Sequence, residues 1–207
     1  MKKYELTAEF IEKWGKKLFR IKALISFGSV EAGELGGYIE KEDNLAHDGN
    51  AWVSGNAEVY GDARVSGNAE VYGDAWVSGN AEVYGDAEVY GDARVSGDAR
   101  VYGDARVCGD ARVCDDARVC DDADYLLIGR IGSRFSFTTF FKNKDKGITV
   151  SCGCFLGTIA EFRAKVTDTH GNNKHAKMYN LAADMAELQI LGEEHFDKLN
   201  TNKSEPF

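Results

Sequence analysis

The sequence holds a single proline, Pro206, and it has no long apolar run. Collagen requires abundant proline with glycine at every third position, so that class is excluded despite the 23 glycines. A membrane-spanning helix needs roughly 18 or more consecutive apolar residues, and none occur. The first residues, MKKYELTAEF, are too polar for a secretory signal. These absences predict a cytoplasmic protein that does not enter membranes.

Positive charge is also scarce. The formal net charge is −9, and residues 49–124 alone carry −10, from twelve aspartates, four glutamates and six arginines. This disfavours direct nucleic-acid binding through a basic face and suits a basic partner, a cation or DNA mimicry. The five cysteines are an odd number, which favours reduced thiols over a disulfide framework.

A six-residue repeat fills the centre of the chain. Twelve valines, Val53 to Val119, recur every six residues, and an alanine precedes each valine by two positions. Alternation along a strand points alanine and valine inward and the residues that flank valine outward. Gly-Asp or Gly-Asn forms each corner, because glycine accepts positive φ. Three hexads close one triangular coil, and the block predicts roughly four coils stacked about 4.8 Å apart.

This pattern resembles the hexapeptide-repeat family of left-handed parallel β-helices. The predicted fold is mainly β. A left-handed triangular β-helix occupies 49–124, between an N-terminal helix and strand cap (1–48) and a small α+β domain (125–195). A tail covers 196–207.

The flanking segments lack the repeat. We expect a helix from Thr7 to Lys17 with Thr7 as its N-cap, and then a strand over 18–24. Leu45 and His47 are predicted to occupy the alanine and valine positions of a degenerate first hexad. After residue 124 we expect strands with a hairpin across 142–147. A capping box at 158–161 then opens a helix that ends near residue 171, and a second helix covers 173–191.

The combination of parts resembles a set of phage and prophage hexapeptide-repeat proteins. The resemblance rests on LGGYIEKEDNLAHDGNAWV before the repeats and on IGSRFSFTTFFKNKDKGITVSCGCFLGTIAEF and THGNNKHAKMY after them. It implies a phage setting. By analogy with other small phage proteins, it implies a protein that neutralises a host defence by binding.

Outward-facing aromatic residues are the main interaction signal. Residues 18 apart lie above one another, so Tyr72 should stack on Tyr90, and Tyr84 on Tyr102. Exposed contiguous aromatics mark an interface, either with further copies of the chain, with a trimer favoured, or with a foreign partner. Plain β-propensity is the alternative. The predicted aromatic interface residues are Trp52, Tyr60, Tyr72, Trp76, Tyr84, Tyr90 and Tyr102.

Arginine replaces glutamate in the outward row toward the end of the block. Arginine binds phosphate in a bidentate manner, so this belt could hold an anion or a nucleotide. Alternatively, each arginine pairs with the aspartate of a neighbouring corner. The belt consists of Arg94, Arg100, Arg106, Arg112 and Arg118, with Arg130 and Arg134 beyond it.

Three metal hypotheses follow from the side chains. Cys152, Cys154, His170 and His175 form a two-Cys, two-His set of the kind that binds zinc, although cysteine also serves as a small buried hydrophobe. The cysteines at 108, 114 and 120 fall on three different faces and cannot share an ion. The corner ladder of Asn56 and the aspartates at 74, 92 and 110 could bind calcium, or it could simply cap turns.

No catalytic constellation stands out. Many hexapeptide-repeat proteins are acyltransferases with a histidine and a loop that interrupts the repeats, whereas this block contains neither. We expect no catalytic residues and no required cofactor. The leading hypothesis is a non-catalytic, oligomeric binding protein that inhibits or sequesters a host antiviral-defence protein or nucleotide signal. The alternatives are a self-assembling scaffold and an acyltransferase.

Overall fold

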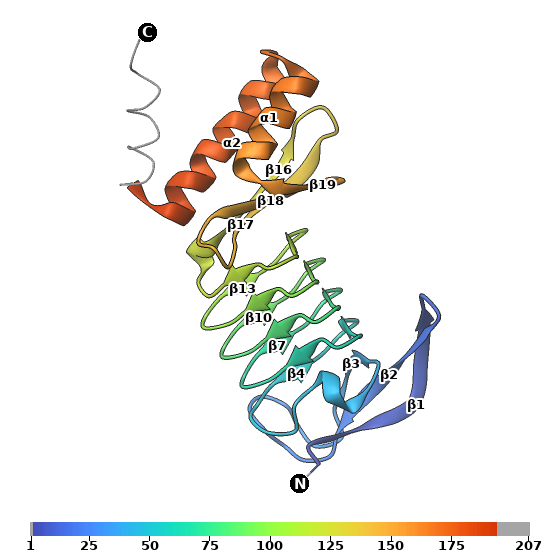
Figure 1. Ribbon diagram of the computed structural model, residues 1–207. Coiled ribbons are helices and arrows are strands. Elements are labelled where there is room, and N and C mark those ends of the chain that lie inside the picture. The colour runs from blue at the N-terminus through green and yellow to red at the C-terminus, as the bar shows by residue number, and fades with distance from the viewer. Residues whose placement is uncertain (1, 194–207) are drawn as a thin grey trace. The chain divides into compact units, whose positions relative to one another are not determined.

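The computed structural model describes residues 2–193, and the described chain is mainly β (Figure 1). The chain forms two compact units. The first comprises Met1–Asp116 with Cys120–Asp122, and the second comprises Ala117–Val119 with Ala123–Phe207. The predicted tail, 196–207, lies outside the described residues. No helix in the described part of the chain is long and apolar enough to cross a membrane.

The first unit contains a long hairpin, one further strand and a series of two-residue strands. Its elements are β1 (Tyr4–Lys13), β2 (Lys16–Ala23), β3 (Leu35–Ile39), the 3-10 helix η1 (Glu42–Asn44), β4 (Trp52–Val53), β5 (Glu58–Val59), β6 (Arg64–Val65), β7 (Glu70–Val71), β8 (Trp76–Val77), β9 (Glu82–Val83), β10 (Glu88–Val89), β11 (Arg94–Val95), β12 (Arg100–Val101), β13 (Arg106–Val107) and β14 (Arg112–Val113).

The repeats form a three-faced β-solenoid, as the hexad period predicted. One face carries β3, β5, β8, β11 and β14 in order, the second carries β4, β7, β10 and β13, and the third carries β6, β9 and β12 (Figure 1). Neighbouring strands pair in parallel with an offset of 18 residues, for example Val59 with Val77. The repeat valines and alanines are fully buried. The left-handed sense of the coil stays a prediction.

The corners explain the glycines. Each repeat glycine from Gly49 to Gly109 has a positive φ. A Cβ on Gly67 would lie 3.0 Å from the backbone nitrogen of Gly85 in the next coil. Glycine is therefore required both by the backbone conformation and by the close approach of stacked coils. Asp115 replaces the repeat glycine at its corner, and it keeps the left-handed conformation with φ 61°.

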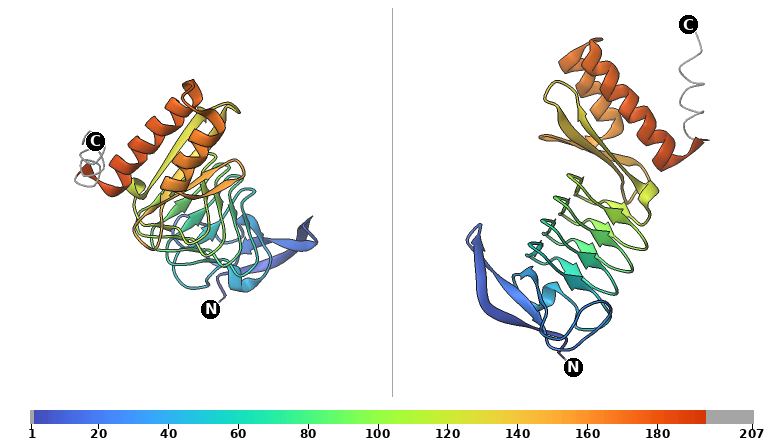
Figure 2. Two further views of the ribbon diagram at one scale, coloured as in Figure 1. Left: turned by 45° about the horizontal axis from the view of Figure 1, so that its top comes forward. Right: turned by 180° about the vertical axis from the view of Figure 1, so that it is seen from behind.

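The predicted helix from Thr7 to Lys17 is wrong, because this segment is strand β1 and the turn that follows it. β1 pairs antiparallel with β2, with Phe10 opposite Phe19. The turn residues Trp14 and Gly15 both have positive φ, 51° and 75°, as a two-residue hairpin turn requires. The hairpin signal was therefore a Trp-Gly pair between two runs that alternate in polarity. Figure 2 shows this hairpin, in blue, beside the first coils.

The solenoid begins earlier than the valine period indicated. Ile39 of β3 pairs with Val59, so β3 adds one strand before the first hexad. The assignment of Leu45 and His47 to alanine and valine positions is also wrong. Leu45 forms a bridge to Val65 and takes the valine position, whereas His47 stacks on Tyr4 with ring centroids 4.4 Å apart. An offset of 20 residues at this junction, in place of 18, explains both errors.

The second unit is a small α+β domain. Its elements are β15 (Arg118–Val119), β16 (Tyr125–Ile131), β17 (Ser136–Lys142), β18 (Ile148–Cys152), β19 (Phe155–Thr158), α1 (Ile159–His170) and α2 (Lys174–Leu191), and η2 spans Asp122–Asp124. β16 to β19 form an antiparallel sheet.

The two helices of this unit pack on that sheet around Phe140, Phe162 and Tyr179. The predicted capping box is confirmed: the Thr158 hydroxyl accepts from the Glu161 N–H, and the Glu161 carboxylate accepts from the Thr158 N–H. The predicted second helix is likewise present as α2, with Asn173 as its N-cap. Local sequence patterns were therefore sufficient to predict both helices.

Candidate functional site

The tyrosine rows form as predicted. The rings of Tyr72 and Tyr90 stack with centroids 4.9 Å apart, and those of Tyr84 and Tyr102 lie 5.1 Å apart. The Tyr72 hydroxyl donates to the Glu88 carboxylate at 2.8 Å. Burial and this hydrogen bond raise the pKa of Tyr72 above its ordinary value. All four rings are half-buried, because each covers a face of its neighbour.

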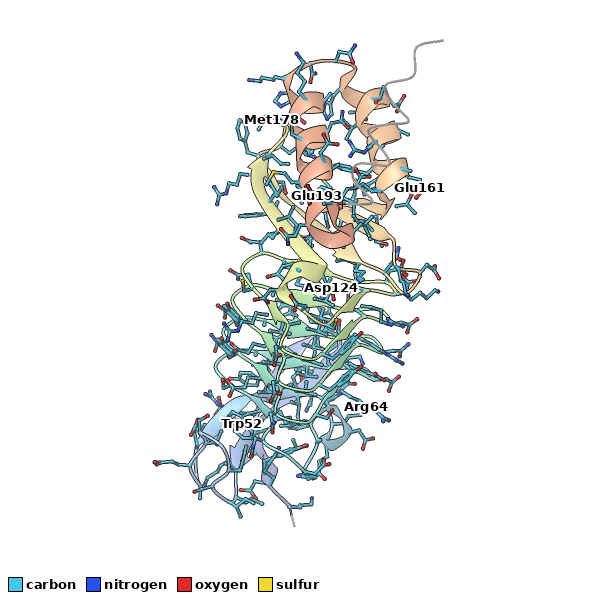
Figure 3. The ribbon with its side chains drawn as sticks, turned by 90° about the vertical axis from the view of Figure 1, so that its left-hand side faces the viewer. Trp52, Arg64, Asp124, Glu161, Met178 and Glu193 are labelled. Atoms are coloured by element: carbon cyan, nitrogen blue, oxygen red, sulfur yellow. The ribbon has the colours of Figure 1, made fainter. Side chains whose placement is uncertain are left out.

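Trp52 holds an outward position of its strand, in register with Glu70, but it is not exposed as an interface residue would be. It is 5% exposed, and the N-terminal segment covers it. The Phe27 ring meets it edge-on at 5.4 Å, and Tyr4 lies 6.4 Å away. Figure 3 labels Trp52 near the N-terminal end of the solenoid and Arg64 on its outer surface. Trp52 is therefore part of the packing between cap and coil.

Two arginines of the belt pair with glutamates one coil earlier. Arg100 Nε lies 3.1 Å from Glu82, and Arg106 Nε lies 3.4 Å from Glu88. Both pairs are outward neighbours in the same parallel ladder, 18 residues apart. The change from glutamate to arginine along the row thus places opposite charges side by side in successive coils. Such exposed pairs contribute at most about 1 kcal/mol each.

The other members of the predicted belt have separate environments. Arg112 is exposed on β14, and Arg118 on β15 of the second unit donates to the Ala117 carbonyl at 2.8 Å. Arg130 lies 6.0 Å from the centre of the Phe137 ring. Arg134 is exposed at the edge of a pocket in the second unit.

An aromatic cluster joins the hairpin tip to the solenoid. The Trp14 ring lies 5.2 Å from Tyr60 and 5.0 Å from Trp76. The Arg94 guanidinium covers the Trp76 ring at 4.4 Å, and Lys13 Nζ lies 5.0 Å from the same ring. Two cations therefore contact the Trp76 ring, and this ring gives the solenoid face beneath the hairpin an aromatic wall.

A cleft of about 440 Å³ lies between this hairpin and the solenoid face. Its lining residues come from β1, from β3 and from the coils, and they combine aromatic, acidic and basic side chains. They are Ile11, Lys13, Tyr38, Asn56, Glu58, Asp74, Trp76, Asp92 and Arg94. The three carboxylates outnumber the two cations, so the lining carries a net charge of −1.

Glu58 is the unusual residue of the cleft. It is only 3% exposed, and its Oε1 atom is in contact with Lys13 Nζ. No described residue donates a hydrogen bond to its other oxygen, Oε2. A buried carboxylate oxygen without a donor is costly. Glu58, a lining residue of this concave, aromatic-walled site, therefore carries a buried acceptor without a donor.

The proposed zinc set is only partly brought together. Cys152 is buried at the end of β18, whereas Cys154 is exposed in the turn beyond Gly153. The rings of His170 and His175 lie 5.8 Å apart where α1 meets α2. Within residues 2–193, no group of three or more His, Cys, Asp or Glu side chains is placed to hold a metal ion.

Hydrogen bonds between side chains join some of the corners of successive coils. The Asn56 amide donates to the Asp74 carboxylate at 3.1 Å, and Asn80 donates to Asp98 at 2.9 Å. Where an asparagine precedes an aspartate in the next coil, its amide donates to the carboxylate, and two like charges are not stacked at that corner. The turn-capping alternative for these residues stays a prediction.

Several residues that line the cleft were not visible in the sequence pattern. Lys13 and Ile11 reach the cleft only because β1 is a strand. Glu58 occupies the same outward position as the exposed Glu70, and only the hairpin above it makes it buried. The outward position of Glu58, directly below Trp76 in the 18-residue register, was the one available signal.

These coils and their ladders define the chain as a β-solenoid repeat protein. Residues 63–79, 87–103, 93–109 and 99–115 match the family described as YdcK Beta solenoid repeat. The matched stretches lie inside the hexad block and leave the hairpin and the second unit without a family assignment. No curated protein shows significant similarity to the chain.

Proposed function

We propose that this β-solenoid is a non-catalytic, phage-type binding protein that inhibits or sequesters a component of host antiviral defence. The single observation that supports a binding role is the cleft beneath the hairpin, where the buried Glu58 carboxylate has an unused oxygen. A ligand that donates to this oxygen would remove the cost of leaving it unpaired.

The chemistry of the cleft favours a cationic group. Glu58, Asp74 and Asp92 supply carboxylates, and Trp76 and Tyr38 supply aromatic faces. Carboxylates beside aromatic rings suit an ammonium or guanidinium group. A basic segment of a protein partner therefore fits better than a nucleotide, whose phosphates the three carboxylates would repel. The acidity of the repeat block would steer such a partner toward the solenoid.

The absence of catalysis is part of the proposal. The residues that line the cleft include no serine, cysteine or histidine to act as nucleophile or imidazole base. The hexads run without interruption from Trp52 to Val113 in the first unit. His47 stacks on Tyr4 in the cap. These features support binding over the acyltransferase alternative, which predicts binding of an acyl-CoA.

Self-association is the second element of the proposal, and α2 supports it. The side of α2 that faces the sheet is buried, yet its other side also carries large apolar residues. Met178, Leu181, Met185 and Leu188 are 39%, 64%, 57% and 45% exposed. Their spacing of three, four and three residues is that of a coiled-coil seam. A second copy of α2 presents the matching seam, so we propose a homo-oligomer, a trimer being favoured.

The binding proposal is tested with blocked tripeptides whose central residue is arginine, lysine or norleucine. Titration is followed by tryptophan fluorescence, because Trp76 lines the cleft. We expect saturable binding of the two cationic peptides and at least a tenfold loss in Glu58→Gln, since a charged hydrogen bond contributes about 1.5–3 kcal/mol. The matched control is Glu70→Gln, an exposed glutamate at the equivalent outward position of β7. Equal binding of the norleucine peptide would overturn the assignment.

The defence role is tested in cells. Bacteria that carry a defined antiviral defence are infected with a sensitive phage, with and without the protein. We expect the protein to restore plaque formation, and Glu58→Gln to remove this effect while Glu70→Gln retains it. Cation binding in solution without any rescue across a panel of defences would leave a binding protein and reject the anti-defence role.

A further inference from the structure

The second unit contains a pocket of its own. Its volume is about 260 Å³, and it is enclosed by the end of β18, the start of β19 and the facing sides of α1 and α2. The lining residues are Arg134, Cys152, Cys154, Phe155, Phe162, Lys165, Val166, Thr169, His170 and Tyr179. This list contains no acidic residue, in a chain whose net charge is −9.

The inner wall of the pocket is aromatic and apolar. Phe162 meets Phe155 at 5.6 Å and Tyr179 at 5.6 Å. Val166 is buried beside them. At the end of β18, the Thr138 hydroxyl donates to the Cys152 thiol at 3.2 Å. The inner wall is therefore built from fixed rings, and it suits the flat or apolar body of a ligand.

The rim is basic. The Arg134 guanidinium lies over Gly153, where a Cβ would come within 3.0 Å of Nη2. None of the residues from 2 to 193 forms an ion pair with Arg134. Lys165 reaches the rim from α1 and also pairs with Asp168 at 3.1 Å. The His170 ring stacks on Tyr179 at 5.7 Å. Three nitrogen-bearing side chains thus surround the mouth of an apolar pocket.

We propose that this pocket binds a small organic anion, a carboxylate or a phosphate carried on an aromatic or apolar body. Arg134 forms the main contact with the anionic group, because a guanidinium offers two parallel donors to carboxylate or phosphate oxygens. The body lies against Phe155, Phe162 and Tyr179. The volume is below the roughly 300–1,000 Å³ of drug-sized sites, so the ligand is smaller than a nucleotide.

Every residue that lines this pocket belongs to the second unit, so its ligand would bind independently of the cleft beneath the hairpin. In this pocket Cys152 and His170 have a role that needs no metal. Cys152 forms part of the inner wall and His170 part of the rim of one pocket.

The test uses four probes on the full-length protein: phenyl phosphate, benzoate, inorganic phosphate and phenol. Binding is followed by calorimetry and by amide chemical shifts of residues that line the pocket, such as Thr169 and His170. We expect one of the two aromatic anions to bind more tightly than inorganic phosphate or phenol. The preferred anion distinguishes a phosphate ligand from a carboxylate ligand.

The key variant is Arg134→Gln, and the matched control is Arg130→Gln, an exposed arginine of the same unit that does not line the pocket. We expect at least a tenfold loss of affinity in Arg134→Gln and no loss in Arg130→Gln. Three results would each overturn the proposal. They are no saturable binding of either aromatic anion, inorganic phosphate or phenol binding as tightly as the preferred aromatic anion, or equal losses in the two variants.

Discussion

The side-chain amide of Asn44 donates a hydrogen bond to the Ala63 carbonyl oxygen, 2.8 Å away, at the open end of the first coil. In later coils, backbone N–H groups of the preceding coil donate hydrogen bonds to the equivalent alanine carbonyls. Trp52 N, for example, donates to the Ala69 carbonyl oxygen at 3.0 Å. The first coil has no predecessor, and Asn44 supplies the missing donor on one face.

Two other donors complete the cap. Lys3 Nζ donates to the Ala51 carbonyl at 2.8 Å, and the Tyr38 N–H donates to the Ala57 carbonyl at 2.9 Å. Each face of the solenoid thus has one alanine carbonyl satisfied by the N-terminal segment. An open sheet edge invites pairing with other chains, so this cap also opposes end-to-end stacking.

We predict that Asn44→Leu destabilises the protein by about 1–3 kcal/mol, the cost of a buried carbonyl without a donor. The measurement is the free energy of unfolding in urea. Asn50→Ala is the control, because its amide bonds Asn68 at an exposed corner and should contribute less than about 1 kcal/mol. Similar losses in both variants would show that the cap has no special role.

The glycine pair in LGGYI has a steric explanation. A Cβ on Gly37 would lie 2.6 Å from the Ala57 carbonyl oxygen and 2.9 Å from Val53 Cγ1. We predict that Gly37→Ala displaces β3 and destabilises the first unit by about 1–3 kcal/mol or more. In Gly147→Ala, where the nearest atom would be 3.5 Å away, the unfolding midpoint should stay near that of the wild type. Thermal unfolding by circular dichroism compares the two.

Stability should depend on pH through Lys3. Burial lowers its pKa from 10.5 to about 8, against a smaller opposing effect of Asp48. Between these two values the unfolded chain keeps a proton that the folded chain has released. The free energy of unfolding therefore rises as the pH increases from about 8 toward 10. Below about pH 8 the Lys3 amine is protonated in both the folded and the unfolded state. The free energy of unfolding therefore does not change with pH through Lys3 in that range.

Tyr4 sets the upper limit of this window. Burial and the nearby Glu42 raise its pKa above the ordinary value of 10, so above about pH 10 the unfolded state releases a proton that the folded state retains. Stability then falls again. Urea midpoints measured across this pH range should show a maximum near about pH 9–10. Lys3→Met should abolish the rising limb. A rising limb of the same slope in that variant would assign the effect to another group.

The coils were predictable from the sequence because their physics is local and repeated. One valine every six residues specifies the strand, the corner and the 18-residue register, and stacks such as Tyr72 on Tyr90 follow from that register. The cleft was not predictable, since it depends on a hairpin folding back over the solenoid. Trp14 at the hairpin tip contacts Tyr60 and Trp76, residues far away in sequence, and no local pattern encodes that approach.

The error at the N-terminus has a related cause. The segment from Thr7 to Lys17 contains good helix formers, and in isolation their propensity favours a helix. The pairing of β1 with β2, together with the burial of Tyr4, overrides that preference. Likewise Glu58 and Glu70 hold the same repeat position, yet only Glu58 lies beneath the hairpin. Tertiary contacts, which a repeat cannot specify, therefore determine which outward residues become a site.

The exposed seam of α2 gives the last prediction. Leu181 and Met185 lie at its centre, with Met178 and Leu188 on either side. Burial of such a seam between copies of α2 is favourable by about 25 cal/mol for each Å² of apolar surface. We therefore expect light scattering after size exclusion to give the mass of a discrete oligomer, with a trimer favoured.

The double variant Leu181→Lys with Met185→Lys should run as a monomer with an unchanged circular dichroism spectrum, because both side chains are exposed on one copy and their loss leaves the core around Phe162 intact. Leu156→Lys is the matched control, since Leu156 is 49% exposed on β19 of the same unit, outside α2. It should keep the mass of the wild-type protein. A wild-type monomer at high concentration, or dissociation by Leu156→Lys as well, would reject α2 as the interface.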